Sequence, residues 1–324
     1  MASRPFGIAA AVVAACVAVS SPLPSRACSV CQCGDPLFTN SGSSAQPGGA
    51  FSFYLESQFF TKSSGVLAED PAEPPEPGDR ERSFQRDLTL YASWTPVPRI
   101  TFSASLPFRW ITITDEPAAG GSEQHNNHGL GDASLYLTSV LWQDLETSPM
   151  SWLEVRAMLK MPTGQSDKTI AGEQDPHIQV GTGSWDYGAG LGGGHHFEHF
   201  LVYANGFYRW NRGGSLDYRY GNAFLANLIA TSEAFPIFGD LLIRPGAELN
   251  FRYAGKDKLD GAPYDSSGGS IFYVTPILEI PLTRDAEHRA PWLRLAVRMP
   301  LGDGVLYGHQ HEGFVYTAGV GFAF

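Results

Sequence analysis

From residue 51 to the C-terminal residue 324, the chain alternates apolar and polar side chains, and this period of two most constrains the possible fold. In residues 293–301, for example, apolar side chains at odd positions alternate with Arg294 and Arg298. Successive side chains on a β-strand point to opposite faces, so this pattern predicts strands with one apolar face. About twelve such segments occur, at residues 51–62, 83–95, 99–112, 131–143, 150–161, 183–197, 199–211, 221–235, 239–253, 269–282, 290–301 and 313–324.

The connections between these segments alternate in length. Short ones, at 96–98, at Glu198 and at 236–238, interleave with long polar ones at 63–82, 113–130, 162–182 and 254–268. Short periplasmic turns and long extracellular loops are typical of outer-membrane barrels, in which the apolar face meets lipid. The sequence therefore predicts an all-β, antiparallel up-and-down transmembrane β-barrel of about twelve strands in the bacterial outer membrane. A secreted sandwich, with its apolar faces turned inward, is the alternative.

Aromatic residues support the barrel. The chain ends on Phe324, which resembles the C-terminal signal read by the barrel-assembly machinery. Other aromatic residues gather near the predicted strand ends, as expected of girdles at the two membrane interfaces. They are Trp94, Phe108, Trp110, Trp152, Trp185, Tyr208, Trp210 and Trp292.

Composition excludes other classes. A net charge of −11 argues against a nucleic-acid-binding protein, because such proteins neutralise phosphates with Lys and Arg. The only long apolar run, residues 6–20, is too short for a spanning helix. This run follows Arg4 and precedes the small-x-small triplet at 25–27, so we expect residues 1–27 to be a secretory signal peptide. A lipobox ending at Cys16 is the alternative.

Residues 28–50 are then a periplasmic leader before the barrel of residues 51–324. It holds Cys28, Cys31 and Cys33 in the stretch CSVCQCGDP, too compact for a disulfide framework. Three thiolates at this spacing could bind Cu(I) or Zn(II), with a fourth ligand from elsewhere. That ligand could come from a histidine-rich turn on the same side of the membrane, at His195, His196 and His199. A local disulfide plus one free or lipidated cysteine is the alternative.

The polar face of the strands predicts the residues that line the pore. They are Glu154, Arg156, Arg244, Glu248, Arg252, Glu279, Arg294 and Arg298. As a channel lining, they select small polar or anionic solutes by field and diameter, and Arg244, Arg252, Arg294 and Arg298 form a basic strip that favours anions. As a structural network, they form salt bridges that fill a barrel narrower than a sixteen-stranded porin. Both interpretations remain open from the sequence.

Three motifs connect the chain to a known family: residues 129–132 (GLGD), 160–164 (KMPTG) and 181–188 (GTGSWDYG). In this order they resemble the outer-membrane barrel transporters associated with the meta-pathway of phenol degradation. The CSVCQCGDP leader resembles that of a subset of such barrels found beyond phenol degraders. The resemblance implies transport across the outer membrane without a set of catalytic residues. Physically, the glycines and prolines of these motifs predict chain reversals where long loops meet strands.

A channel or transporter for an unidentified small solute is therefore the leading hypothesis. One alternative is a barrel whose cysteine leader docks a periplasmic metal-carrying or redox partner. Another is an outer-membrane phospholipase with a serine and a histidine on its outer wall. The sequence contains no G-x-S-x-G motif, and we expect no histidine beside a serine in a lipid-facing row. We accordingly expect no enzyme activity.

Overall fold

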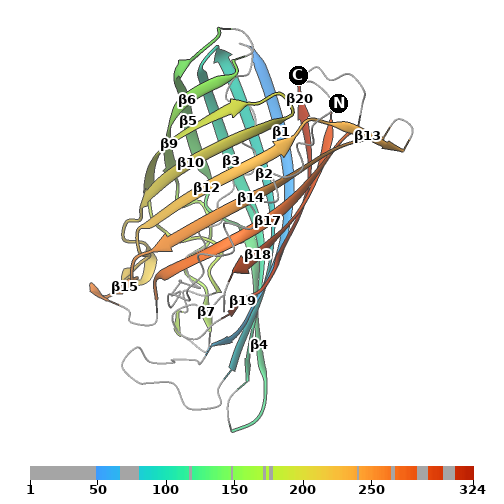
Figure 1. The fold of residues 1–324 in the computed structure, drawn as a ribbon. Helices are drawn as coiled ribbons and strands as arrows, with labels where there is room; N and C mark the ends of the chain where they lie inside the picture. Colours follow the sequence, from blue (N-terminus) through green and yellow to red (C-terminus); the bar gives the residue numbers. More distant parts are fainter. Residues whose placement is uncertain are drawn as a thin grey trace.

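The computed structural model describes residues 49–65, 80–116, 119–146, 149–170, 173–174, 178–238, 241–263, 267–282, 291–301 and 311–324. These residues form a closed barrel of twelve antiparallel wall strands (Figure 1). The wall strands are β1 (Ala50–Gly65), β2 (Arg80–Val97), β3 (Ile100–Glu116), β4 (Glu123–Leu130) with β5 (Ser134–Gln143), β6 (Ser151–Lys160), β9 (Asp186–His196), β10 (Phe200–Trp210), β12 (Ala223–Ser232), β14 (Leu241–Ala254), β17 (Gly269–Pro281), β18 (Trp292–Leu301) and β20 (Val315–Ala323). Pairing of β1 with β20 closes the barrel, which confirms the predicted fold.

The two faces of the wall differ as predicted for a membrane barrel. On β18, Leu293 and Leu295 are exposed on the outside, whereas Arg294 and Ala296 are buried inside. Large apolar side chains cover the outside of the other strands in the same way. A soluble sandwich would bury this apolar row, so the described residues match a lipid-facing wall. None of the described residues forms a helix long and apolar enough to cross a membrane.

At the end with short turns, four aromatic rings follow one another along the outer wall. Phe51 stacks on both Trp94 and Phe324, and Trp94 stacks on Phe102, with ring centroids 5.9–6.2 Å apart. The Phe324 N–H also donates a hydrogen bond to the Phe51 carbonyl at 2.9 Å, and the Phe51 N–H donates to the Phe324 carbonyl at 2.7 Å. The C-terminal residue thus takes part in closing the barrel.

Two of the predicted girdle residues were placed on the wrong face. Trp152 and Trp292 point into the barrel rather than into lipid, and Trp152 is 2% exposed. Each ring lies over a glycine of the neighbouring strand: a Cβ on Gly194 would be 2.5 Å from the Trp152 ring, and one on Gly321 would be 2.1 Å from the Trp292 ring. The missing side chains leave room for the indoles inside.

Two connections were also predicted wrongly. Residues 123–130, expected as part of a loop, form β4, which continues the fourth wall strand and pairs with β3. This hairpin projects from the end of the barrel with the long loops (Figure 1), and there Thr112 donates a hydrogen bond to Asn126 at 2.7 Å. The predicted turn at 236–238 belongs to β13 (Phe235–Phe238), which pairs with β14.

Two small sheets lie at the end of the barrel with the long loops. In one, β7 (Thr169–Ile170) pairs with β8 (Glu173–Gln174); in the other, β15 (Lys258–Leu259) pairs with both β11 (Tyr218–Arg219) and β16 (Ala262–Pro263). A further strand, β19 (His311–Glu312), extends the wall beside β1. Short turns mark the periplasmic end of such barrels, so the long-loop end is extracellular. The predicted signal peptide and nearly all of the leader lie outside the described residues.

Candidate functional site

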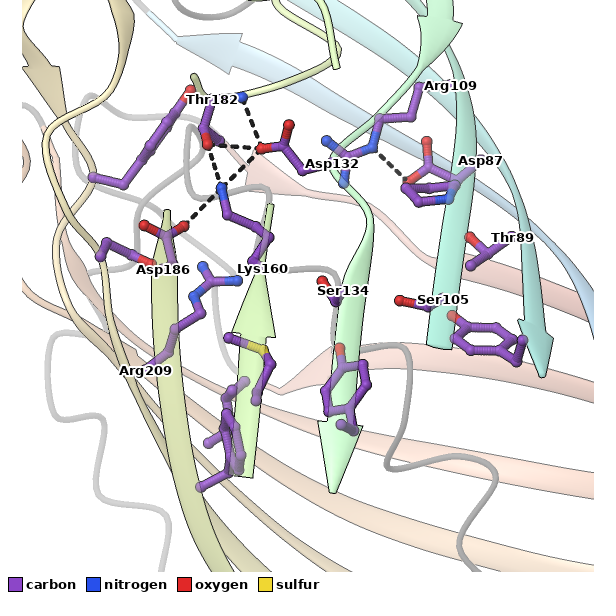
Figure 2. A pocket seen from close by; sticks show the side chains of 18 of the residues that line it. Asp87, Thr89, Ser105, Arg109, Asp132, Ser134, Lys160, Thr182, Asp186 and Arg209 are labelled. Carbon is purple, nitrogen blue, oxygen red and sulfur yellow. Dashed lines mark hydrogen bonds and ion pairs between the residues drawn. The ribbon is translucent and has the colours of Figure 1, made fainter. Parts of the chain in front are cut away.

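The three sequence motifs meet at Lys160, in the half of the lumen nearer the long loops. The Lys160 Nζ lies 2.8 Å from the Asp132 Oδ2 and 2.7 Å from the Asp186 Oδ2 (Figure 2). It also donates to the hydroxyl of Thr182. All three charged side chains are at least nine-tenths buried. One cation therefore joins three strand ends that are distant in the sequence.

Asp132 holds the same three motifs together through neutral donors. It accepts hydrogen bonds from the backbone N–H of Gly164 at 3.0 Å and of Thr182 at 2.9 Å. The backbones of the motifs are also in contact, because a Cβ on Gly164 would lie 2.7 Å from the Gly181 Cα and 2.9 Å from the Gly131 Cα. Only glycine fits there. We call the assembly of Asp132, Lys160, Gly164, Thr182 and Asp186 the Lys160 clasp.

The Lys160 clasp corrects the role predicted for the first motif. Residues 131–133 are not a reversal between a loop and a strand, but a break between β4 and β5 within one wall strand. The break turns the Asp132 carboxylate inward, where it reaches the other two motifs (Figure 2). The contact that the three motifs share was not visible in the sequence.

Part of the connection between β6 and β9 lies against the inside of the wall. Ile178 and Val180 are fully buried and pack on Ile111 and Ile113, which belong to the inner face of β3. The side chain of Arg109 donates a hydrogen bond to the Val180 carbonyl at 3.0 Å, and that of Asn127 donates to the Ile178 carbonyl at 2.9 Å. Residues 178–182 therefore occupy part of the extracellular mouth, and the Lys160 clasp fastens them there.

Next to the Lys160 clasp, the lumen contains a polar cavity. Seven charged groups line it: Asp87, Arg109, Asp132, Arg156, Lys160, Asp186 and Arg209. Figure 2 labels all of them except Arg156. Its volume is about 80 Å³, which holds several water molecules but is well below the ~300–1,000 Å³ of pockets for drug-sized ligands. The lumen is thus narrow and polar at this level, with room for water.

A belt of apolar side chains borders the cavity. It contains Tyr54, Tyr91, Tyr136, Met158, Phe207, Leu225 and the partly buried Trp292. The rings lie flat against the wall because glycines stand beneath them. A Cβ on Gly190 would be 2.6 Å from the Phe207 ring, and one on Gly319 would be 2.3 Å from the Tyr54 hydroxyl. We call these seven residues the aromatic belt; their side chains fill part of the lumen beside the cavity.

The predicted pore-lining residues all occupy inward-facing positions, and four of them form one network. Arg294 contacts Glu248 at 2.6 Å and Glu279 at 3.3 Å, and Arg244 contacts Glu279 at 3.3 Å. Arg244, Glu279 and Arg294 are direct partners across β14, β17 and β18, the ladder arrangement that the alternation predicted. The side chains of Arg294 and Glu248 are almost fully buried. This side of the lumen is therefore lined by paired charges.

The other four predicted residues make further contacts in the lumen. Glu154 and Arg156 pair with each other at 3.2 Å, and the Tyr203 hydroxyl donates to Glu154 at 2.6 Å. Arg298 stacks over Tyr273 at 5.7 Å from the ring centroid. Arg252 occupies an inward position on β14, opposite Leu225 and Ile271.

Sequence reasoning missed several charged residues of the cavity. Asp87 and Arg109, 3.7 Å apart, were not among the predicted pore-lining residues, and neither were Asp132 and Asp186. The alternation of inward and outward side chains along a strand could have identified Asp87 and Arg109. Asp87 precedes the outward Leu88, and Arg109 follows the outward Phe108, so both lie in inward rows.

The proposed metal site at the leader cannot be located, since Cys28, Cys31 and Cys33 lie outside the described residues. His195, His196 and His199 lie at the turn between β9 and β10. Within the part of the chain that the structure describes, no three His, Cys, Asp or Glu side chains are grouped as metal ligands would be.

One expectation about the outer wall was wrong. Ser151 and His195 are partners across β6 and β9, face outward, and join their Oγ and Nδ1 atoms at 2.8 Å. Asp144 does not orient the imidazole, as a catalytic triad requires. It bonds instead with Ser151 and with the Met150 N–H, and these hydrogen bonds hold the pKa of Asp144 below its usual range. The arrangement caps a periplasmic turn.

Comparison with known proteins agrees with this architecture. An outer-membrane channel from Pseudomonas putida F1 is 16% identical and superposes with a TM-score of 0.61, covering 86% of this chain and 97% of that one. Two further structures match more weakly. The β domain of the Bordetella autotransporter BrkA is 10% identical, with a TM-score of 0.45 and 85% of this chain and 100% of that one covered. A Pseudomonas aeruginosa FadL homologue is 9% identical, with a TM-score of 0.42 and 87% of this chain and 94% of that one covered. No curated protein matches the sequence. The model of the family described as "Putative MetA-pathway of phenol degradation" matches residues 83–286, more than half of the chain, so this outer-membrane barrel belongs to that family.

Proposed function

We propose that the protein is a narrow outer-membrane channel for small polar solutes. The observation that carries this proposal is the charged, polar cavity inside a closed barrel whose outside is apolar. Charged side chains are tolerated inside such a barrel only where they meet water or one another. A solute would pass the Lys160 clasp at the mouth, then the cavity, and then the aromatic belt.

We propose further that the channel prefers anions. The predicted pore-lining residues comprise five arginines and three glutamates, and the cavity adds Lys160, Arg109 and Arg209 against three aspartates. The ion pairs of Arg244 and Arg294 with Glu279 offset the positive charges of these two arginines. Arg252 and Arg298 occupy inward positions on β14 and β18 and complete the basic strip, so their charges contribute to the field that a solute meets in the lumen.

Planar-bilayer recordings in a KCl gradient test both proposals. Wild type should conduct with small single-channel steps and a reversal potential on the anion-selective side. The double variant Arg252→Gln/Arg298→Gln should shift the reversal potential towards cations. A control with the same charge change at two exposed positions, Arg82→Gln/Lys258→Gln, should leave it unchanged. Absence of conductance in wild type would instead favour a purely structural barrel.

We also propose that the leader binds a soft metal, Cu(I) or Zn(II), through Cys28, Cys31 and Cys33. The C-x-x-C-x-C spacing supports this, because three thiolates within six residues can surround one ion. The leader precedes the first wall strand, whose N-terminus lies at the periplasmic end of the barrel (Figure 1). Metal bound there would be presented to the periplasm beside the channel.

A further inference from the structure

Arg86 faces outward from β2, on the side of the barrel that meets lipid. Its neighbours Gln85 and Asp87 are buried inside, and the next outward side chains on either side are Phe84 and Leu88. Two other outward charges of the described strands, Arg82 and Glu116, lie farther out and contact each other at 3.8 Å. Arg86 makes no ion pair with a described residue. A charge in a lipid-facing row requires a physical reason, because it costs ~2–4 kcal/mol at the bilayer midplane and ~0–1 near the interfaces.

Two aromatic rings hold Arg86 in place. Its guanidinium lies 5.0 Å from the centroid of Phe59 and 5.1 Å from that of Trp110. These residues are its direct partners on the two neighbouring strands, β1 and β3. Tryptophan side chains of barrels mark the depth of the lipid headgroups. The guanidinium is therefore fixed at headgroup depth by cation–π contacts and directed at the membrane.

An apolar groove begins beside Arg86. It has an open volume of about 470 Å³ and is lined by Phe59, Pro276, Ile277, Leu278, Leu295, Ala296, Val297, Tyr316, Thr317 and Ala318. Phe59 borders both the groove and the guanidinium, and Tyr316 and Val297 continue the same row across β20 and β18. From this row the groove runs towards Ala318 and Leu278, which lie nearer the periplasmic end and so deeper in the hydrocarbon.

The groove is recessed because several side chains along it are small. Its residues include alanine and proline in place of large side chains, and Pro276 has no N–H to donate to the sheet. The ladder between β17 and β18 runs to the pair Ile277–Ala296 and resumes at Val274–Met299. The outer wall is therefore indented where a lipid chain anchored at Arg86 would lie.

We propose that this surface binds a phosphorylated glycolipid of the outer leaflet, with a lipid phosphate on Arg86 and an acyl chain in the groove. A guanidinium binds phosphate oxygens through two parallel N–H donors, and Phe59 and Trp110 orient it for that contact. The long-loop end of the barrel is extracellular, which places Arg86 in the outer leaflet, where such lipids carry their phosphates. The groove is apolar and opens to the membrane, as an acyl chain requires.

Binding of purified lipid A to the detergent-solubilised full-length barrel, measured by native mass spectrometry, tests the proposal. Wild type should bind bisphosphorylated lipid A at least about tenfold more tightly than its dephosphorylated form. Arg86→Gln should remove that preference, and Arg86→Lys should retain part of it, because lysine keeps the charge but not the paired donors. Ala318→Trp, which fills the groove, should weaken binding of both forms. Arg82→Gln is the matched control and should bind as wild type does.

Two results would overturn the proposal: equal binding of both lipid A forms by wild type, or unchanged phosphate preference in Arg86→Gln. Heat-modifiable mobility on gels establishes that each variant is folded. Channel conductance is measured on the same preparations and should be unaffected in Arg86→Gln, because Arg86 lies outside the lumen. Failure of lipid binding is thereby distinguished from failure of the channel function.

Discussion

Replacing Lys160 by methionine tests the Lys160 clasp. The substitution keeps an unbranched side chain of similar length but removes the charge that lies 2.8 Å from Asp132 and 2.7 Å from Asp186. Both carboxylate side chains are only 3–4% exposed, and after the substitution they would stay buried without their cation. Removing one partner of a buried ion pair costs ~3–5 kcal/mol. Asp132 keeps its hydrogen bonds to Gly164 and Thr182, so we expect the lower part of that range, about 3 kcal/mol.

The same substitution should change conductance. The Lys160 clasp fastens residues 178–182 in the extracellular mouth, so loosening it should widen the mouth and raise the single-channel conductance. Stability is measured by urea unfolding in lipid vesicles, followed by tryptophan fluorescence. Lys258→Met, at an exposed lysine of the long loops, is the control and should change stability by less than ~0.5 kcal/mol. A loss below ~1 kcal/mol for Lys160→Met, with unchanged conductance, would refute the reasoning.

Three further predictions concern the wall, its closure and the leader. Leu90 lies midway along the outward row of β2, between Trp94 and Arg86, so Leu90→Arg should lower the free energy of unfolding by ~2–4 kcal/mol. Urea titration measures this loss beside that of the control Leu90→Ala, and equal losses in the two variants would contradict a position at the bilayer midplane. Deletion of Phe324 removes two hydrogen bonds to Phe51 and its ring stacking, so heat-modifiable barrel in the membrane fraction should fall, and a wild-type amount would contradict its role in closure. Serine at all three leader cysteines should abolish Cu(I) or Zn(II) in metal analysis while the barrel still assembles, whereas equal metal content in both proteins would leave the disulfide interpretation.

The sequence by itself determined the wall of the barrel and which face of each strand meets lipid. Leu293, Arg294 and Leu295 illustrate why: a strand turns successive side chains to opposite sides, so a local pattern of two fixes the face without knowledge of any partner. The ladder of Arg244, Glu279 and Arg294 could be predicted for a related reason. Consecutive strands of a meander are neighbours, so the inward charges of β14, β17 and β18 lie side by side.

Only the tertiary structure decided what fills the lumen. Asp132, Lys160 and Asp186 meet because barrel closure and strand tilt bring three strand ends to one height, which no local pattern encodes. The inward course of residues 178–182 could not be predicted either, because a loop has no periodic side-chain pattern that indicates where its backbone runs. Trp152 was assigned to the wrong face because its fit depends on Gly194 of the next strand. Contacts between residues far apart in the chain depend on how the whole sheet closes, and that information is distributed over all twelve strands.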